Sequence, residues 1–166
     1  MRTIYLMISG AITAHRASEI AAALSAHDER LIAVQTPNAI KLISPTTLAR
    51  IERVELVESY FDPRIRPRPP RGSVLFAPCS FNSLNKLAAG IADNLALSIT
   101  AEMLGFGERV VVGISMNEPL FNHPATQRAI ATLQSWGVQV VPPRDTGSGL
   151  MLAPTEELIA ALMRRE

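Results

Sequence analysis

The chain has 166 residues, of which 48% are hydrophobic and 19% are charged, and its formal net charge is +1. This balance excludes a strongly basic nucleic-acid-binding protein, and no apolar run is long enough to span a membrane. The single cysteine, Cys79, excludes an intramolecular disulfide framework and a multi-cysteine metal cage.

Apolar strands alternate with helices along the chain, and we expect residues 1–166 to form a single domain. Pro45 suits the start of a predicted helix. Residues 54–59 are ambiguous between a strand and the end of a helix. Residues 63–72 contain too many prolines to form a regular helix or strand. The predicted elements, in chain order, are strand 2–9, helix 13–26, strand 31–34, helix 46–52, strand 73–77, helices 82–89 and 92–104, strand 110–114, helix 124–136, strand 138–141 and helix 155–165.

Strands that are apolar throughout, with helices between them, predict an α/β protein whose parallel sheet is covered on both faces. Ligands of such sheets bind beyond the carboxyl ends of the strands. Here these ends are residues 9–12, 36–38, 78–83 and 115–119, all rich in Ser, Thr, Asn and Gly. The pattern therefore predicts a polar ligand at this edge of the sheet.

Each of these segments also has a purely structural interpretation. Gly10 suits a phosphate-binding turn, but a tight turn between strand and helix needs glycine in any case. Ser80 and Asn82 either bind a ligand or cap a helix. Cys79 is a nucleophile only with a base beside it, and otherwise a small buried residue. The absence of a GxGxxG motif counts against NAD.

The charged and aromatic residues that remain give weaker signals. His15, His27 and His123 do not have the spacing of zinc ligands, so we expect no metal, and His123 suits a structural hydrogen bond at the start of a helix. The arginines of residues 63–72 either bind an anion or stay in solvent. The N-terminal residues have the pattern of a mature strand rather than a signal peptide, which predicts a cytoplasmic protein.

Four motifs together resemble a known family. Residues 9–14 (SGAITA) are similar to T-G-S-I-A-A, and residues 36–39 (TPNA) to T-x-x-A. Residues 77–95 (APCSFNSLNKLAAGIADNL) follow A-P-A-S-A-N-T-x-x-K-x-A-x-G-I-x-D-N-L, and residues 115–124 follow A-M-N-x-x-M-x-x-H-P. These patterns belong to the homo-oligomeric FMN-containing cysteine decarboxylases, which include the phosphopantothenoylcysteine and peptidyl-cysteine decarboxylases.

The resemblance implies a Rossmann-like or flavodoxin-like three-layer sandwich that binds FMN between subunits of a homotrimer or dodecamer. Asn117 would hold the substrate carboxylate. Gly10, Ala11 and Ile12 would approach the flavin phosphate. The other cofactor-binding residues it implies are Ser9, Thr36, Asn38, Ser80, Phe81, Asn82, Ser83 and Ser115.

The chain also departs from the pattern. The decarboxylases carry an active-site histidine upstream of the proline that aligns with Pro78, where this chain has Arg64 and Arg66. The phosphopantothenoylcysteine enzymes carry a cysteine shortly before a G-x-G-x-M segment. Residues 147–151 (GSGLM) match that segment, but Pro143 stands near the place of the cysteine. We therefore expect Arg64 and Arg66 to bind substrate as cations, since arginine does not act as a base near neutral pH.

Our prediction is an FMN-dependent enzyme of altered chemistry that oxidises or reduces a small or peptidyl substrate, with neither nucleic acid nor membrane as a partner. It predicts no useful decarboxylation of phosphopantothenoylcysteine or of a C-terminal peptidyl cysteine. The alternatives are a cysteine decarboxylase of that type and a non-catalytic FMN-binding module.

Overall fold

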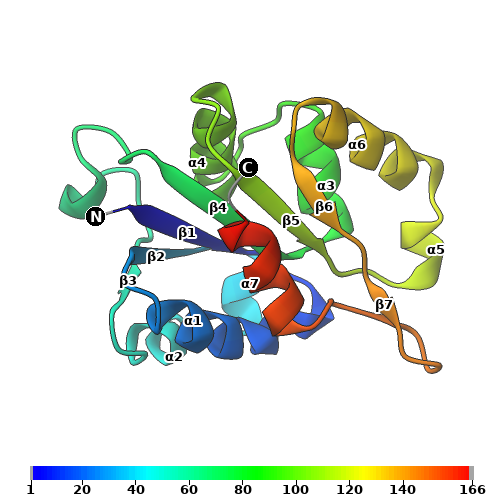
Figure 1. Ribbon diagram of the computed structural model, residues 1–166, viewed down its shortest axis with the longest axis horizontal. Helices are drawn as coiled ribbons and strands as arrows, with labels where there is room; N and C mark the ends of the chain where they lie inside the picture. Colours follow the sequence, from blue (N-terminus) through cyan, green and yellow to red (C-terminus); the bar gives the residue numbers. More distant parts are fainter. Residues whose placement is uncertain (1, 165–166) are drawn as a thin grey trace.

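A parallel sheet of six strands forms the middle layer of the computed structural model, which describes residues 2–164 (Figure 1). The strand order is β3-β2-β1-β4-β5-β6, and every neighbouring pair is parallel. The strands are β1 (Thr3–Ile8), β2 (Arg30–Gln35), β3 (Val54–Leu56), β4 (Gly72–Cys79), β5 (Val110–Ile114) and β6 (Gln139–Val141).

Helices cover both faces of this sheet, so the expected three-layer α/β fold is confirmed (Figure 1). One layer consists of α1 (Ala17–Ser25), α2 (Pro45–Ala49) and α7 (Thr155–Met163). The other consists of α3 (Phe81–Ala88), α4 (Leu95–Gly105) and α6 (Pro124–Ser135). Short elements complete the fold: the 3₁₀ turns η1 (Ile12–Arg16), η2 (Ala39–Lys41) and η3 (Pro63–Ile65), helix α5 (Glu118–Phe121), and the hairpin of β7 (Arg144–Asp145) and β8 (Leu150–Met151).

The alternation of side chains along β1 shows why its sequence is apolar at every position. Tyr5 and Met7 pack in the core under α3, α4 and α6, whereas Ile4, Leu6 and Ile8 pack in the core under α1, α2 and α7. Successive side chains of a strand point to opposite faces, so a strand buried on both faces needs apolar residues throughout.

Several details differ from the sequence prediction. The proline-rich segment contains one short turn, η3, which begins at Pro63 because Asp62 accepts a hydrogen bond from the N–H of Arg64. Strand β4 continues through Pro78, where its register against β5 shifts between Phe76 and Cys79, so that the proline falls at an irregularity and the pairing resumes at Cys79. Helix α5 and the hairpin were not predicted, since both are too short to show a period.

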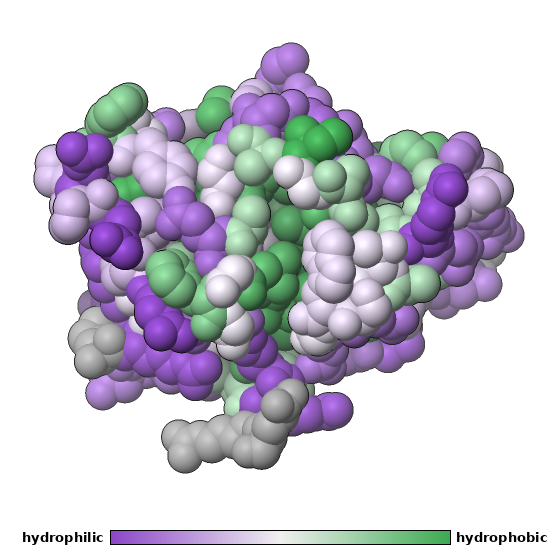
Figure 2. All heavy atoms as spheres, turned by 90° about the horizontal axis from the view of Figure 1, so that it is seen from above, coloured by the Kyte–Doolittle hydropathy of each residue, from purple (hydrophilic) through white to green (hydrophobic). Residues whose placement is uncertain are grey.

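The outer face of the layer of α3, α4 and α6 is not uniformly polar. Figure 2 views the molecule from above this layer and shows a hydrophobic band between hydrophilic margins. The partly buried apolar side chains packed against the core beneath include Ala88, Leu95, Leu104 and Ile130. No helix among residues 2–164 is long and apolar enough to cross a membrane.

Candidate functional site

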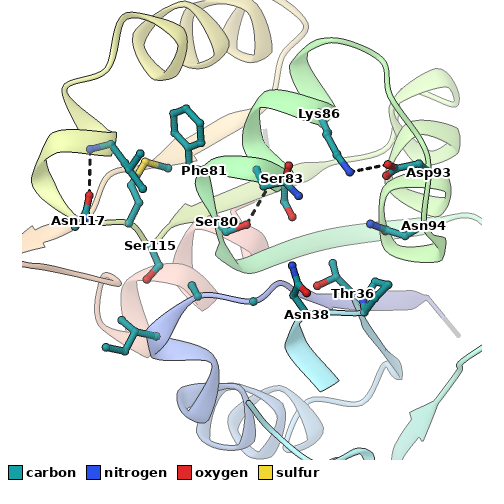
Figure 3. Close-up of a pocket in the computed structure, with 17 residues that line it drawn as sticks. Thr36, Asn38, Ser80, Phe81, Ser83, Lys86, Asp93, Asn94, Ser115 and Asn117 are labelled. Carbon is teal, nitrogen blue, oxygen red and sulfur yellow. Dashed lines mark hydrogen bonds and ion pairs between the residues drawn. The ribbon is translucent and has the colours of Figure 1, made fainter. Parts of the chain in front are cut away.

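A cavity of about 680 Å³ opens at the carboxyl ends of β1, β2, β4 and β5 (Figure 3). Polar side chains from all four strand ends meet there, as the strand-end rule predicts. The predicted residues that line it are Gly10, Ala11, Ile12, Thr36, Asn38, Ser80, Phe81, Asn82, Ser83, Ser115 and Asn117.

Ser9 is the predicted cofactor-binding residue that does not line the cavity. Its side chain is fully buried, its Oγ donates to the carbonyl of Pro78 (2.7 Å), and the N–H of Ser80 donates to the same Oγ (2.7 Å). This hydroxyl therefore ties the end of β1 to the turn after β4. Ser9 positions the cavity-lining turns without facing the cavity.

Gly10 is required by the close approach of two strand ends. A Cβ at Gly10 would lie 2.6 Å from Cβ of Asn38, which is far below contact distance. A side chain at position 10 would push the turn after β2 away from the turn after β1. The glycine therefore keeps Thr36 and Asn38 beside the first turn, so packing alone explains it.

The structure confirms the capping interpretation of Ser80 and also places this residue at the cavity. Its Oγ accepts a hydrogen bond from the N–H of Ser83 (3.3 Å), which caps α3, while Ser80 and Ser83 both line the cavity. A weak cap of this kind leaves hydroxyl hydrogens available to a ligand.

Asn117 caps the next helix and thereby fixes the direction of its amide. The N–H of Leu120 donates to Oδ1 of Asn117 (3.1 Å), and Asn117 lines the cavity next to Ser115. Because Oδ1 is engaged by the helix, the NH₂ group is the end of this amide left for a ligand. A neutral NH₂ donor suits a carboxylate oxygen and needs no particular protonation state.

Ser115 is held by a second buried hydroxyl. Its Oγ lies 2.5 Å from Oγ1 of Thr13, and both residues are buried. The pair joins the first turn of η1 to the end of β5. It is a polar feature that the motif, with alanine at this position, does not contain.

An ion pair that was not predicted from the sequence lies at one end of the cavity. Nζ of Lys86 lies 2.6 Å from Oδ2 of Asp93, and both residues line the cavity together with Asn94 (Figure 3). The signal was present, because the K and D-N of the long motif align with these positions. The remaining unpredicted lining residues are Pro37, Met116 and Leu120.

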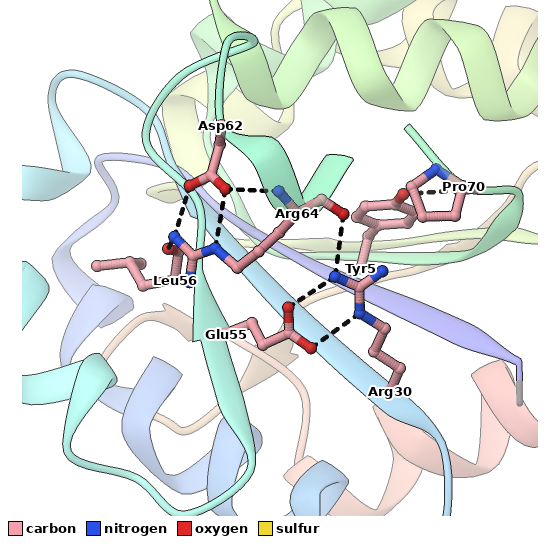
Figure 4. Close-up of polar contacts among 7 residues, drawn as sticks. All are labelled: Tyr5, Arg30, Glu55, Leu56, Asp62, Arg64 and Pro70. Atoms are coloured by element: carbon pink, nitrogen blue, oxygen red, sulfur yellow. Dashed lines mark hydrogen bonds and ion pairs between the residues drawn. The ribbon is translucent and has the colours of Figure 1, made fainter. Parts of the chain in front are cut away.

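Arg64 and Arg66 do not line the cavity of their own chain. Arg64 donates to both carboxylate oxygens of Asp62 and to the carbonyl of Leu56 (2.7 Å), and Arg30 donates to the carbonyl of Arg64 (Figure 4). The guanidinium of Arg66 instead lies 5.8 Å from the ring centre of Phe61, which is 80% exposed. Of the two arginines, Arg64 is thus occupied by its own loop.

The cysteine and the histidines have structural positions. Cys79 is completely buried, and burial raises the pKa of its thiol, so the thiolate that a nucleophile needs is disfavoured. Nδ1 of His123 accepts the N–H of Ala125 (3.0 Å) at the start of α6, which confirms the expected hydrogen bond. His15 is exposed, with Nδ1 3.1 Å from the carbonyl of Ile12. No group of three or more potential metal ligands occurs in the described part of the chain.

The donor set indicates what this cavity can bind. It consists of hydroxyls, amides and backbone groups, with Lys86 and Asp93 paired to each other. Such groups bind phosphate, polyol hydroxyls and heterocycle carbonyls by hydrogen bonds. Among the described lining residues there is no histidine to move a proton near neutral pH.

Comparison with known proteins identifies the family of this chain. A family model described as Flavoprotein matches residues 1–165. The bifunctional coenzyme A biosynthesis protein CoaBC of Haemophilus influenzae is 27% identical over 93% of this chain and 41% of its own length, so the chain spans about two-fifths of that relative.

Two further proteins match along nearly their whole length. A probable phosphopantothenoylcysteine decarboxylase of Streptococcus mutans is 28% identical over 90% of this chain and 91% of its own. The solved structure of the FMN-dependent cysteine decarboxylase TvaF from thioviridamide biosynthesis superimposes with a TM-score of 0.79 at 22% identity, over 98% of this chain and 96% of that one. At this identity the structural match establishes the fold.

Proposed function

Because this chain belongs to the Flavoprotein family, we propose that its strand-end cavity binds FMN and that the protein is an FMN-dependent decarboxylase of a cysteine-type substrate. The observation that carries the proposal is the meeting of the family motifs, from separate parts of the chain, in one cavity. We further propose that residues 1–166 act as a single flavoprotein domain.

The residues present fit FMN. Backbone and hydroxyl donors of Gly10, Ala11, Ile12 and Ser83 suit the phosphate, and the side chains of Thr36 and Asn38 suit a polyol chain. Ser80, Asn82 and Ser115 add neutral donors and acceptors for the ring system, and Ser9 holds the turns that carry them. The protein named FMN-dependent TvaF and the relative from Streptococcus support this choice of cofactor and reaction class.

FMN, when bound, would supply the oxidation of the substrate, and the residues of this chain would bind and orient the substrate and set the electrostatic environment. The NH₂ group of Asn117 holds the substrate carboxylate, in an orientation fixed by the hydrogen bond from Leu120 to Oδ1. The apolar side chains of Met116, which is buried, and Leu120, which is half-buried, line that end of the cavity. The residues of the strand ends therefore bind and orient, and none of them changes charge.

The names of the relatives favour the decarboxylase over the oxidation or reduction that we expected from the missing histidine. One observation keeps oxidation or reduction without carbon dioxide release as a second candidate. No described lining residue is a titratable base near neutral pH, and Lys86 and Asp93 neutralise each other. General acid–base assistance is typically worth about 10²–10⁴ in rate. Whether the site has a residue that transfers this proton therefore decides between the decarboxylase and the second candidate.

A second copy of the chain is part of the proposal. Ile12 at the cavity is 84% exposed and Leu42 is 55% exposed, which leaves apolar surface that another subunit would cover. We propose Arg66, whose guanidinium lies over the exposed ring of Phe61, as the cation that binds substrate in a neighbouring cavity, because Arg64 is held by Asp62. We propose a homotrimer or a multiple of it, such as a dodecamer.

The test is carbon dioxide release by the FMN-loaded protein from cysteine, phosphopantothenoylcysteine and a peptide ending in cysteine. Flavin-dependent release from one of them, lost when the substrate carboxylate is amidated, supports the decarboxylase. Anaerobic bleaching of the flavin by these thiols without carbon dioxide release supports the second candidate. A protein that binds FMN but neither bleaches nor releases gas with any of them is a binding module.

A further inference from the structure

Phe81 is the only aromatic residue among the described residues that line the cavity. It is half-buried at the first position of α3, where it lines the cavity (Figure 3). The motif that the chain otherwise follows has alanine at this position. A benzyl group therefore occupies part of the cavity wall where the pattern would leave space.

A neighbouring ring fixes the direction of Phe81. The ring centres of Phe81 and His123 lie 5.4 Å apart with an interplanar angle of 79°, an edge-to-face arrangement that aromatic pairs favour. His123 is itself fixed, because Nδ1 accepts the N–H of Ala125 and the ring must then carry its proton on Nε2. The α6 N-terminus thus holds His123, and His123 holds Phe81.

We propose that Phe81 is the aromatic contact for the flavin ring system in this cavity, and that His123 is a positioning residue that sets the orientation of Phe81. The proposal rests on the proposed binding of FMN. A planar heterocycle gains from an aromatic side chain by offset stacking or by an edge contact, and the other lining side chains offer neither. The ordered ring also loses little conformational freedom on binding.

The first experiment replaces Phe81. Phe81→Ala is expected to raise the dissociation constant for FMN about two- to tenfold in a titration of the apoprotein. Phe121→Ala is the matched control, since Phe121 is also half-buried against the same core but does not line the cavity. Phe81→Tyr is expected to lower the fluorescence of bound FMN relative to the unmodified protein, because a phenol in van der Waals contact quenches flavins by electron transfer.

The second experiment separates the two roles of His123. His123→Asn keeps a helix-capping acceptor and removes the ring. In the Phe81→Tyr background it is expected to keep the melting temperature and to weaken both the quenching and the affinity for FMN. His123→Phe keeps a ring and removes the acceptor, so it is expected to keep the affinity and to lower the melting temperature by about 2–4 °C.

The outcomes distinguish this inference from the proposed function. If the unmodified protein does not bind FMN, the proposed function fails. If it binds FMN but Phe81→Ala matches Phe121→Ala in affinity and Phe81→Tyr leaves the fluorescence unchanged, the contact is absent and the inference is overturned. If the Phe81 variants behave as expected and His123→Asn changes neither quenching nor affinity, the positioning role of His123 is wrong.

Discussion

Ser9 illustrates how one buried hydroxyl determines the shape of the cavity at the residue scale. It bonds to Pro78 and Ser80 across neighbouring strands and is completely shielded from solvent. Ser9→Ala leaves the part-buried N–H of Ser80 without this acceptor, and leaves the carbonyl of Pro78 with only the backbone N–H of Ser9 of its two bonds to this residue. We expect the free energy of unfolding to fall by about 1–3 kcal/mol in urea denaturation.

Ser25→Ala is the control for this measurement, since the hydroxyl of Ser25 also donates to a carbonyl, that of Ala22, but at the surface. An equal loss of stability in the two variants would show that Ser9 has no special role. Weaker FMN binding in Ser9→Ala is expected as well, because the turn at Ser80 loses its tie to β1.

Asn117 gives a prediction about function at the same scale. Asn117→Asp keeps an oxygen for the N–H of Leu120 but replaces the NH₂ donor by a negative oxygen that repels a carboxylate. We expect kcat/KM for a carboxylate substrate to fall about 10- to 100-fold with little change in stability or in FMN affinity. Asn122→Asp, an exposed change in the following turn, is the control. Unchanged kcat/KM in Asn117→Asp would remove Asn117 from substrate binding.

The loop before β4 shows how polar contacts order a segment at the element scale. Hydrogen bonds from the side chain and N–H of Arg64 lower the pKa of Asp62 to about 2, from an ordinary value of 3.8. Tyr5 donates to the carbonyl of Pro70 (2.6 Å), and Ile65 is fully buried beneath the loop. Residues 57–71 are therefore held at both ends and in the middle, although their prolines exclude a long helix or strand.

The lowered pKa of Asp62 predicts a pH dependence. A carboxyl group with a depressed pKa contributes stability above pH 3.8, and this contribution is lost as the pH falls toward about 2. The difference in unfolding free energy between the unmodified protein and Asp62→Asn should therefore be constant from pH 5 to pH 7 and shrink between about pH 4 and pH 2. A difference that stays constant down to about pH 2 would contradict this role of the Asp62–Arg64 pair.

Among the helices and strands, those with a clear hydrophobic period or a continuous apolar run were predictable from the sequence. Strand β5 falls at residues 110–114 as expected, because a run of apolar residues buried on both faces has clear ends. Helix α4 begins at Leu95 rather than residue 92, since the side chain of Asn94 caps it. The cavity residues were predictable because strand ends of a parallel sheet meet at one edge. That Ser9 faces away, and that Arg64 is bound by Asp62, depends on side-chain packing that no spacing reveals.

At the scale of the whole molecule, two exposed apolar features motivate the proposed self-association. The hydrophobic band over α3, α4 and α6 (Figure 2) and the exposed Ile12 at the cavity are apolar surface on a chain with few aromatic residues. We expect light scattering to give three times the 18.0 kDa chain mass or a multiple of that value. A stable monomer with tightly bound flavin would contradict the oligomer.

Ile12→Asp tests whether a second subunit covers the cavity. The side chain is 84% exposed, so the substitution is not expected to destabilise an isolated chain by more than about 0.5 kcal/mol. It is expected to shift the oligomer toward smaller species in light scattering and to weaken FMN binding. Ala22→Asp, an exposed change on α1, should do neither. Unchanged mass and affinity in Ile12→Asp would place the interface elsewhere.

The most direct test of the central claim is to identify and count the chromophore. The purified protein is precipitated with acid, and the compound that it releases is identified by mass spectrometry. In a second measurement, the apoprotein is titrated with FMN. The account predicts a yellow protein that releases FMN, and one FMN bound per chain on titration. A colourless protein that also takes up no added FMN, or one that releases FAD, would contradict it.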